Sequence, residues 1–269
     1  MTEYTTLFTN KLQESSAIQG TLSSLIDGFT PISLREMDSR ALLDRIDTKY
    51  VMNSKQVMQT LERLKADYSI LSIRGQCLNP YRTLYFDTPD FDLYNLHVNG
   101  QAERYKVRCR EYIESCTSFL EVKHRTRKDR TIKQRIATTQ PLLWLNHCAK
   151  SWLRTLVPVD SSLLEPKLLN TFTRITLVNK TICERVTIDI ALTFMRGRRA
   201  ISMGNLVIAE VKMDDAHCSS PFTETMRDQK IHAEGFSKYC IGVSLLYDRV
   251  KKNSLKPRLI QLEKIAAGV

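Results

Sequence analysis

The sequence predicts an α+β fold in which an antiparallel β-barrel surrounds a charged tunnel and helices cover its outside. Three strand-like stretches, 105–110, 120–125 and 208–212, place a charged residue at every second position and apolar residues between them. Because side chains alternate between the two faces of a strand, each stretch has one apolar and one charged face. The apolar faces are expected to pack against helices, which leaves the charged faces to line an interior.

Positive charge is concentrated along the chain. The 269 residues carry a formal net charge of +11, and residues 103–135 hold eleven Lys or Arg against five Asp or Glu, a net of +6. A basic balance of this kind attracts nucleic acid, phosphate chains or a membrane surface. The hydrophobic fraction of 42% is enough for a sizeable core, so the chain is expected to fold as a globular protein.

The first quarter of the chain is predicted to form one or two helices, then a strand and another helix. Apolar residues at irregular helical spacing over 5–28 predict one or two helices, and we expect residues 1–32 to form a helical extension packed on the barrel. A strand is predicted over 45–52. Asn53 or Ser54 then caps a helix over about 55–66.

The pattern changes to period two after Pro80. A strand over 82–87 ends at a Thr-Pro-Asp turn, and Asn99-Gly100 marks another turn before the basic strand at 104–113. The next strand, 117–126, leads into an exposed hairpin tip at 127–130. A third strand carries Lys133 and Arg135 on one face, and an antiparallel meander is the natural connection.

The second half alternates helices with long strands. A helix is predicted from Pro141 to about Leu156, a second over 221–232, and a last short one that Ser237 caps and that runs to Leu245. Strand patterns cover 168–178, 182–194 and 206–213. The main domain is expected to span 33–250. Residues 251–269 read as a basic, solvated tail that could instead steer polyanions or dock to a membrane partner.

Cysteine usage and hydropathy indicate a cytoplasmic protein. The seven cysteines are odd in number and form no C-x-x-C pair, so a reducing compartment is the simpler interpretation. Because the sequence starts with polar residues, we expect no signal peptide. The sequence contains no run of about eighteen apolar residues, so we expect no transmembrane helix.

The charged faces of the predicted strands form one set if the register permits. Its members are Lys106, Arg108, Arg110, Glu121, Lys123, Arg125, Lys133, Arg135, Glu210 and Lys212. Arg174 and Asp189 extend it from neighbouring strands. The simpler alternative is a solvated sheet face with cross-strand pairs of about 0.2–1 kcal/mol each. Two like charges about 4 Å apart repel by roughly 4 kcal/mol at an effective dielectric near 20, so a tunnel this cationic is stabilised by a bound anion.

Several short motifs follow one another along the chain. They include Tyr85-Phe86-Asp87-Thr88-Pro89-Asp90, Asn99-Gly100, and the strand with Lys106, Arg108 and Arg110. In this order they resemble the triphosphate tunnel metalloenzyme superfamily. Further motifs narrow the resemblance to its polyphosphate polymerase branch, which includes the catalytic domain of the eukaryotic vacuolar transporter chaperone complex. These are Asp47-Thr48-Lys49-Tyr50, Glu121-Val122-Lys123, Lys133-Gln134-Arg135, Glu210-Val211-Lys212 and Phe236-Ser237-Lys238-Tyr239. The resemblance covers about 33–247.

The resemblance implies a fold and an activity. The fold is an antiparallel eight-stranded β-barrel tunnel with peripheral helices. The activity is transfer of the γ-phosphate of ATP onto a growing polyphosphate chain, with release of ADP and with a divalent metal, Mn²⁺ or Mg²⁺, as cofactor. The implied partners are ATP and polyphosphate or pyrophosphate. A separate membrane protein is a conceivable partner, and the sequence makes no prediction of an oligomeric state.

The resemblance also implies roles for individual residues. The implied phosphate ligands are Lys49, Arg108, Arg110, Lys123, Lys133 and Arg174, to which the charged face adds Lys106, Arg125, Arg135 and Lys212. Glu210 matches the metal-binding glutamate, and Glu121 is either a second metal ligand or a structural partner of Lys123 or Arg110. Lys238 matches a lysine at the tunnel mouth, where Ser237 caps a helix whose amide dipoles favour phosphate. Lys238, Arg174 and Lys123 are therefore the expected catalytic residues.

Two departures from the superfamily pattern bear on function. The Glu-x-Glu-x-Lys strand of the tunnel hydrolases is replaced by Ile46-Asp47-Thr48-Lys49, and Gly235 stands where a further lysine often occurs. The first change removes metal carboxylates and favours a polymerase over a hydrolase. A tri- or polyphosphate hydrolase and a noncatalytic polyphosphate-binding module stay open as alternatives. Nucleic-acid binding is not expected, because the basic residues alternate inward with few aromatics between them.

Overall fold

The strands with alternating charge lie side by side in one large sheet. The computed structural model describes residues 22–38, 46–128, 130–214 and 219–268. Within these ranges eight strands follow one another in the order β2-β11-β9-β8-β4-β5-β6-β7, and all neighbours are antiparallel. Their bounds are β2 Ile46–Asn53, β11 Leu206–Met213, β9 Glu184–Arg196, β8 Glu165–Asn179, β4 Asn79–Asp87, β5 Arg104–Tyr112, β6 Thr117–Arg125 and β7 Thr131–Thr138.

Short strands and helices complete the fold. Strand β3 (Tyr68–Leu71) pairs with β8, β1 (Thr30–Ile32) pairs with β3 in parallel, and β10 (Arg199–Ser202) pairs with β9. The labelled α-helices are α3 Leu34–Asp38, α4 Ser54–Leu64, α5 Asp92–Val98, α6 His147–Leu153, α7 Pro221–Asp228, α8 Lys238–Leu246 and α9 Lys256–Ala267. Short 3₁₀ turns lie at Ser161–Leu163 and Asn253–Leu255. Within the described ranges no helix is both long and apolar enough to cross a bilayer.

The α+β class and the antiparallel eight-strand path confirm the predicted fold, but the path does not close into a complete barrel. Strands β2 and β7 are its two ends, and no strand pairing joins them in the described part of the chain. The free edge of β2 is contacted instead by a later segment, through a bridge between Tyr50 and Ala233 and a hydrogen bond from the Glu234 amide to the Lys49 carbonyl. Strand β7 stays exposed over most of its length, so the sheet curls but keeps a seam.

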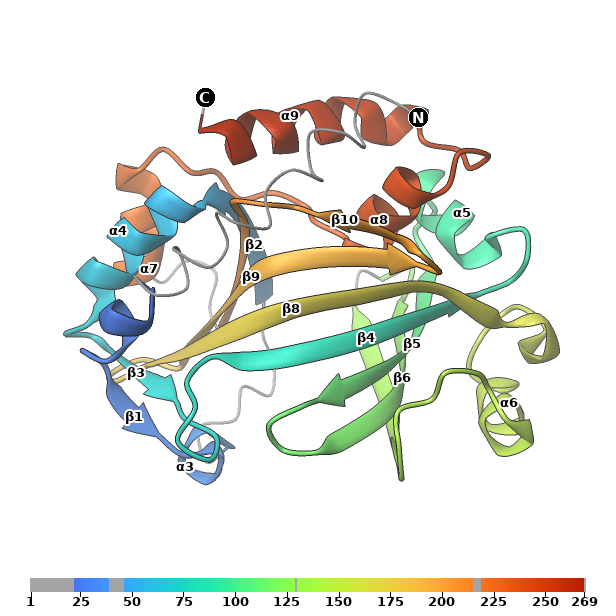
Figure 1. The fold of residues 1–269 in the computed structure, drawn as a ribbon, viewed down its shortest axis with the longest axis horizontal. Coiled ribbons are helices and arrows are strands. Elements are labelled where there is room, and N and C mark those ends of the chain that lie inside the picture. Colours follow the sequence, from blue (N-terminus) through green and yellow to red (C-terminus); the bar gives the residue numbers. More distant parts are fainter. Residues whose placement is uncertain (1–21, 39–45, 129, 215–218, 269) are drawn as a thin grey trace.

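Helices cover the apolar outer face of the sheet, as the alternation predicts. On one side α4 and α7 pack over β2, β11, β9 and β8, with Val57, Leu61 and Phe222 buried against strand residues such as Ile188. Elsewhere α5 and α6 cover β4, β5 and β6. Figure 1 shows α4 and α7 together at one side of the sheet and α6 at the other. The predicted Asn53 cap of α4 is present, because its side chain accepts from the Gln56 amide.

Helix α8 packs against the concave face and fills one end of it. Its apolar residues belong to the same buried cluster as Tyr85, Leu168 and Phe194, which point into the concavity from β4, β8 and β9. All α8 residues after Lys238 are buried. The interior is therefore charged along part of its length and apolar where α8 packs, an apolar part that the alternation of charges did not predict.

Gly242 allows this close approach and gives the first testable prediction. A Cβ at this position would lie 2.5 Å from Leu168 Cδ2 and 2.7 Å from Phe194 Cδ1. Overpacking of this kind costs about 1–3 kcal/mol, more than the ~1 kcal/mol that alanine gains over glycine inside a helix. We expect Gly242→Ala to lower the free energy of unfolding in urea by about 1–2 kcal/mol. Gly235→Ala is the matched control, because a Cβ there would meet no atom within 4 Å; equal stability of the two variants would contradict the prediction.

The two chain ends differ from the sequence prediction. The expected solvated tail contains α9, whose Leu259, Leu262 and Ala266 are buried in the α8 cluster. Of the expected helical extension, residues 1–21 lie outside the described ranges; 22–26 are helical, and 30–32 form a strand.

Two predicted helices are shorter than expected. The helix expected from Pro141 begins only at His147, because Asn146 accepts a hydrogen bond from the Ala149 amide and sets the start there. The helix expected over 221–232 ends at Asp228.

Candidate anion-binding site

Strand register brings the predicted charged residues onto the concave face of the sheet. Across β5, β6 and β7 two rows form, Lys106–Lys123–Lys133 and Arg108–Glu121–Arg135. Across β2 and β11 the pairs are Lys49–Glu210 and Asp47–Lys212, and Arg174 of β8 pairs with Asp189 of β9. Strand β6 faces β2 and β11 across the concavity, since Lys123 of β6 interacts electrostatically with Glu210 and Lys49.

Glu210 bridges two lysines at the centre of this surface. Its Oε1 lies 2.6 Å from Lys49 Nζ, and its Oε2 lies 3.2 Å from Lys212 Nζ. Burial alone would raise the pKa of the Glu210 carboxyl, but Lys212 and Lys49 outweigh it and hold the pKa well below its usual range. The side chain is still 18% exposed, whereas those of Asp189 and Glu121 are 4% and 1% exposed. Glu210 is thus the most accessible of these three carboxylates.

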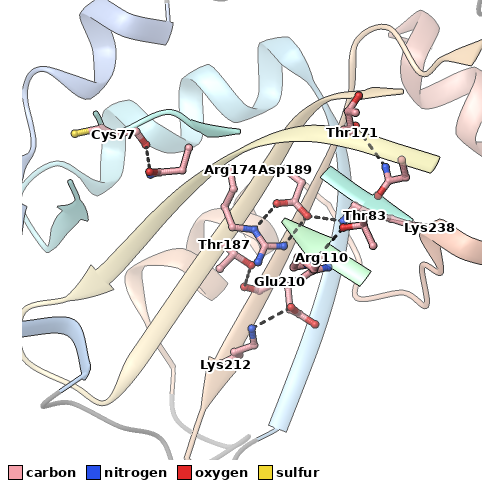
Figure 2. Close-up of polar contacts among 12 residues, drawn as sticks. Cys77, Thr83, Arg110, Thr171, Arg174, Thr187, Asp189, Glu210, Lys212 and Lys238 are labelled. Carbon is pink, nitrogen blue, oxygen red and sulfur yellow. Dashed lines mark hydrogen bonds and ion pairs between the residues drawn. The ribbon is translucent and has the colours of Figure 1, made fainter. Parts of the chain in front are cut away.

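Asp189 joins β8 to the start of α8. Its Oδ1 accepts from Arg174 Nε at 2.6 Å, and its Oδ2 accepts from Arg174 Nη2 at 2.9 Å and also pairs with Lys238 Nζ. Figure 2 shows Arg174, Asp189 and Lys238 converging next to Glu210 and Lys212. Against the opposing effect of burial, Arg174 and Lys238 lower the pKa of Asp189 to about 2. The alternation placed Asp189 on the charged face, but its role as the anchor of Lys238 was not predicted.

Glu121 forms the third bridge. Its Oε2 accepts from Arg108 Nε at 2.8 Å, and its Oε1 lies 2.5 Å from Lys133 Nζ. Burial opposes ionisation, yet Arg108, Arg110 and Lys133 together lower the pKa of Glu121 to about 2. Of the two alternatives left open by the sequence, the structure displays the ion pair, although the partners are Arg108 and Lys133 rather than Lys123 or Arg110.

Three buried or half-buried cations of the concave face form no salt bridge with a carboxylate within the residues that the structure describes. They are Lys106, Arg110 and Lys123. Arg110 is 8% exposed, donates to the Thr83 hydroxyl at 3.3 Å, and has its guanidinium carbon 5.8 and 5.9 Å from the ring centres of Tyr81 and Phe172. Burial lowers the pKa of Lys106, and it lowers the pKa of Lys123 to about 8. A surplus of partly desolvated positive charge attracts a polyanion.

The depressed pKa of Lys123 predicts a pH dependence of anion binding. The charged form binds the anion, and the free protein loses that proton as the pH rises through about 8. Since the bound anion favours the charged amine, binding should take up a proton near pH 8 and weaken above it. Between pH 7 and 9 we expect tripolyphosphate affinity to fall about tenfold relative to Lys123→Arg, whose guanidinium stays charged. Calorimetry in EDTA buffers of different ionisation heat measures this; parallel profiles for the two proteins would contradict it.

The other predicted residues occupy more peripheral positions. Arg125 lies at the exposed end of β6, and the Arg135 guanidinium stacks over the Phe119 ring at 4.6 Å. The Ser237 side chain accepts a hydrogen bond from the Cys240 amide and so caps α8, as predicted. The Ser237 hydroxyl oxygen is therefore already engaged by the helix. Lys238 is the first residue of α8 and lies 4.6 Å from the centre of the Phe172 ring.

Sequence reasoning missed the role of Asp87, which it used only as part of a motif. Its buried carboxylate accepts from the amides of Thr88, Leu93 and Tyr94 and from the Tyr239 hydroxyl, over 2.5–2.9 Å. Burial outweighs these hydrogen bonds and raises the pKa of Asp87. Because Tyr239 follows Lys238, Asp87 ties the end of β4 and the start of α5 to the helix that carries Lys238. A polar residue at the apolar end of a predicted strand was the available signal.

The donor set fits a metal that arrives with the substrate's phosphates. Among the described residues no three His, Cys, Asp or Glu side chains gather in a group that could hold a metal ion. Mg²⁺ is commonly bound through one or two carboxylates with substrate phosphates and water completing its shell. Glu210, accessible and surrounded by cations that attract phosphate, meets this requirement, whereas Glu121 is enclosed by Arg108 and Lys133.

Hollows on the outside of the sheet offer no comparable site. One of about 340 Å³ is lined by residues including Tyr105, His124 and Gln134, and one of about 520 Å³ by residues including Glu103 and Arg127. Tyr105, His124 and Gln134 alternate with the charged strand residues and face the other way, and the second hollow lies at the turn between β6 and β7. None of the predicted phosphate ligands lines either hollow.

Comparison with known proteins agrees with this geometry. Residues 44–247 match the VTC domain family. A solved structure described as a candidate adenylate cyclase of Bacillus halodurans is 13% identical, with a TM-score of 0.50 over 76% of this chain and 98% of that one. An adenylyl cyclase candidate of Hippeastrum, described as having a dominant triphosphatase activity, is 14% identical, with a TM-score of 0.48 over 74% and 95% of the two chains. No curated protein matched the sequence. The likeness to the first of these structures shows a shared fold.

Proposed function

Because this chain belongs to the VTC domain family, we propose that it is an ATP-dependent polyphosphate polymerase with its active site on the concave face of the sheet. A terminal oxygen of the growing chain attacks the γ-phosphorus of ATP. The bond between that phosphorus and the β–γ bridging oxygen breaks, and ADP leaves. Acceptor, donor and product are all polyanions, so one cationic surface can bind each of them.

The observation that carries the proposal is the unbalanced charge of the concave face. Three carboxylates each bridge two cations, and Lys106, Arg110 and Lys123 are left over in partly buried positions. A single phosphate would satisfy only part of this set. A chain of phosphates, with about one negative charge per unit, can neutralise cations that are spread along β5 and β6.

The residue types suit phosphoryl transfer. This reaction depends on positioning and on neutralising charge at the non-bridging oxygens more than on covalent participation. Arg108, Arg110 and Arg174 offer planar donor forks, and Lys49, Lys123 and Lys133 offer point charges. Lys238 stands at the N-terminus of α8, where its ammonium group and the helix dipole both stabilise developing negative charge.

A divalent cation, Mn²⁺ or Mg²⁺, would be held by Glu210 together with the phosphates of the nucleotide, and would supply further neutralisation of phosphate charge. Glu210 would have to exchange contact with Lys49 or Lys212 for contact with the metal. Both lysines would then be free to bind phosphate oxygens.

The test is a product assay on the full chain. The protein is incubated with ATP and MnCl₂ or MgCl₂, and products are separated on a polyacrylamide gel stained for polyphosphate while ADP and free phosphate are measured. We expect long chains, with ADP formed in proportion to the phosphate incorporated, and no product in EDTA. Free phosphate without chains would indicate a hydrolase instead. Tight polyphosphate binding without either product would indicate a binding module.

A further inference from the structure

Aromatic rings line one end of the concave face, beside the cations. Tyr81 of β4 stacks on Phe172 of β8, with ring centres 5.1 Å apart. Tyr112 of β5 meets Tyr81 edge-on, with ring centres 5.0 Å apart. Phe119 of β6 continues the series, 5.9 Å from Tyr112 and nearly perpendicular to it. The register pairs Phe119 with Arg110, so this aromatic wall begins where the row of cations ends.

The four rings differ in what they contact. Tyr81 and Phe172 are buried, and the guanidinium groups of Arg110 and Arg174 lie over both of them. These two rings support the cations. Tyr112 and Phe119 are only half-buried, at the end of the sheet where Thr117 is exposed. They are therefore the rings with area left for a ligand.

Phe119 already accepts a flat partner. The Arg135 guanidinium lies over its ring at 4.6 Å and comes from β7, the exposed strand at the seam. A planar cation reaches this ring from the open side of the concavity, so a planar ring of a ligand has the same access. Nucleobases stack on aromatic side chains whatever their sequence, because each base has a π face.

We propose that Phe119 and Tyr112 seat the base of a nucleoside triphosphate whose phosphates lie on Arg110, Lys123 and Lys106. The inference rests on the proposed function and adds the residues that distinguish a nucleotide from an inorganic triphosphate. Arg110 stands next to Phe119 across the strand pair, so base and first phosphates would occupy neighbouring positions. Arg135 would move aside or stack on the other face of the base.

The experiment compares binding of ATP and of inorganic tripolyphosphate to the full chain by calorimetry at equal free Mg²⁺. Phe119→Leu keeps an apolar side chain without a π face, and Phe119→Tyr keeps the face. We expect Phe119→Leu to weaken ATP binding about tenfold or more while tripolyphosphate binding changes less than twofold. Phe119→Tyr should bind ATP like the unmodified protein. Tyr105→Leu is the matched control, because Tyr105 is a half-buried ring of β5 on the outer face, stacked on His124, and it should change neither affinity.

The outcomes separate this inference from the proposed function. Equal effects of Phe119→Leu on both ligands, or no effect on either, would overturn the base site and leave a polymerase possible. Failure of the unmodified protein to bind ATP at all would overturn both. A selective loss of ATP binding in a protein that makes no polyphosphate would support the base site and count against the polymerase.

Discussion

Replacing Asp87 with alanine is expected to lower the free energy of unfolding by about 3–5 kcal/mol. The carboxylate is fully buried and accepts three amide hydrogen bonds and one from the Tyr239 hydroxyl. Its removal leaves these donors unsatisfied in the interior, and loss of one member from a buried polar network typically has this cost. The start of α5 also loses its anchor to β4.

Urea unfolding followed by circular dichroism measures the effect. Asp92→Ala is the control, because Asp92 is a nearby, exposed acid of α5 whose carboxylate accepts a hydrogen bond from the Thr88 hydroxyl, at 2.8 Å. It should lose about 1 kcal/mol or less. If Asp87→Ala were as stable as Asp92→Ala, the proposed tie between β4, α5 and α8 would be wrong. Should Asp87→Ala fail to fold, Tyr239→Phe removes a single donor and should lower stability by a smaller amount.

The faces of the strands could be predicted because the period of two leaves little freedom. Once 105–110 is a strand, Lys106, Arg108 and Arg110 share a face whatever surrounds them. The same reasoning placed Lys123 and Glu210 correctly on the concave side of β6 and β11. The period of two carried no information on register, which decides that Glu121 pairs with Arg108 and Lys133 and not with Lys123.

Contacts between segments distant in sequence account for most of what was missed. The edge of β2 is contacted by residues near Ala233, about 180 positions later, and not by β7. A local sequence pattern does not reveal which distant segment will contact a strand edge. The role of Asp87 likewise depends on Tyr239 arriving from α8. The helix α9 is a different case, because Leu259, Leu262 and Ala266 have helical spacing. The tail was nevertheless predicted to be solvated, because it is rich in basic residues.

The roles of individual residues are the part that neither sequence pattern nor geometry determines alone. Arg174 is held by Asp189 and packed against Tyr81 and Phe172, an arrangement that would serve a purely structural ion pair equally well. Lys238 is different, because it is the first residue of α8 and donates one hydrogen bond to Asp189, whereas Arg174 donates two. Its substitution therefore separates chemistry from folding better than that of the arginine.

Replacing Lys238 with alanine is expected to lower kcat for polyphosphate synthesis by about 10²–10³-fold, with little loss of stability. The substitution removes one preorganised donor aimed at developing phosphate charge, and losses of that kind have this size. Asp189 keeps its two hydrogen bonds to Arg174, so its charge stays paired. Synthesis is followed by ADP release at saturating ATP, with thermal unfolding as the check on folding. Lys251→Ala, an exposed lysine just beyond α8, is the control and should leave kcat unchanged.

The ratio of kcat to KM effects decides what Lys238 does. A group that acts only on the transition state changes kcat and kcat/KM equally, whereas one that binds ATP in the ground state raises KM and leaves kcat unchanged. Lys238→Arg keeps the charge but changes its position, and the pairing with Asp189 requires a compact ammonium group beside the Arg174 fork. We therefore expect Lys238→Arg to recover ATP binding without recovering kcat. Full activity of Lys238→Ala would remove this lysine from the mechanism and shift the search for the catalytic cation to Lys123.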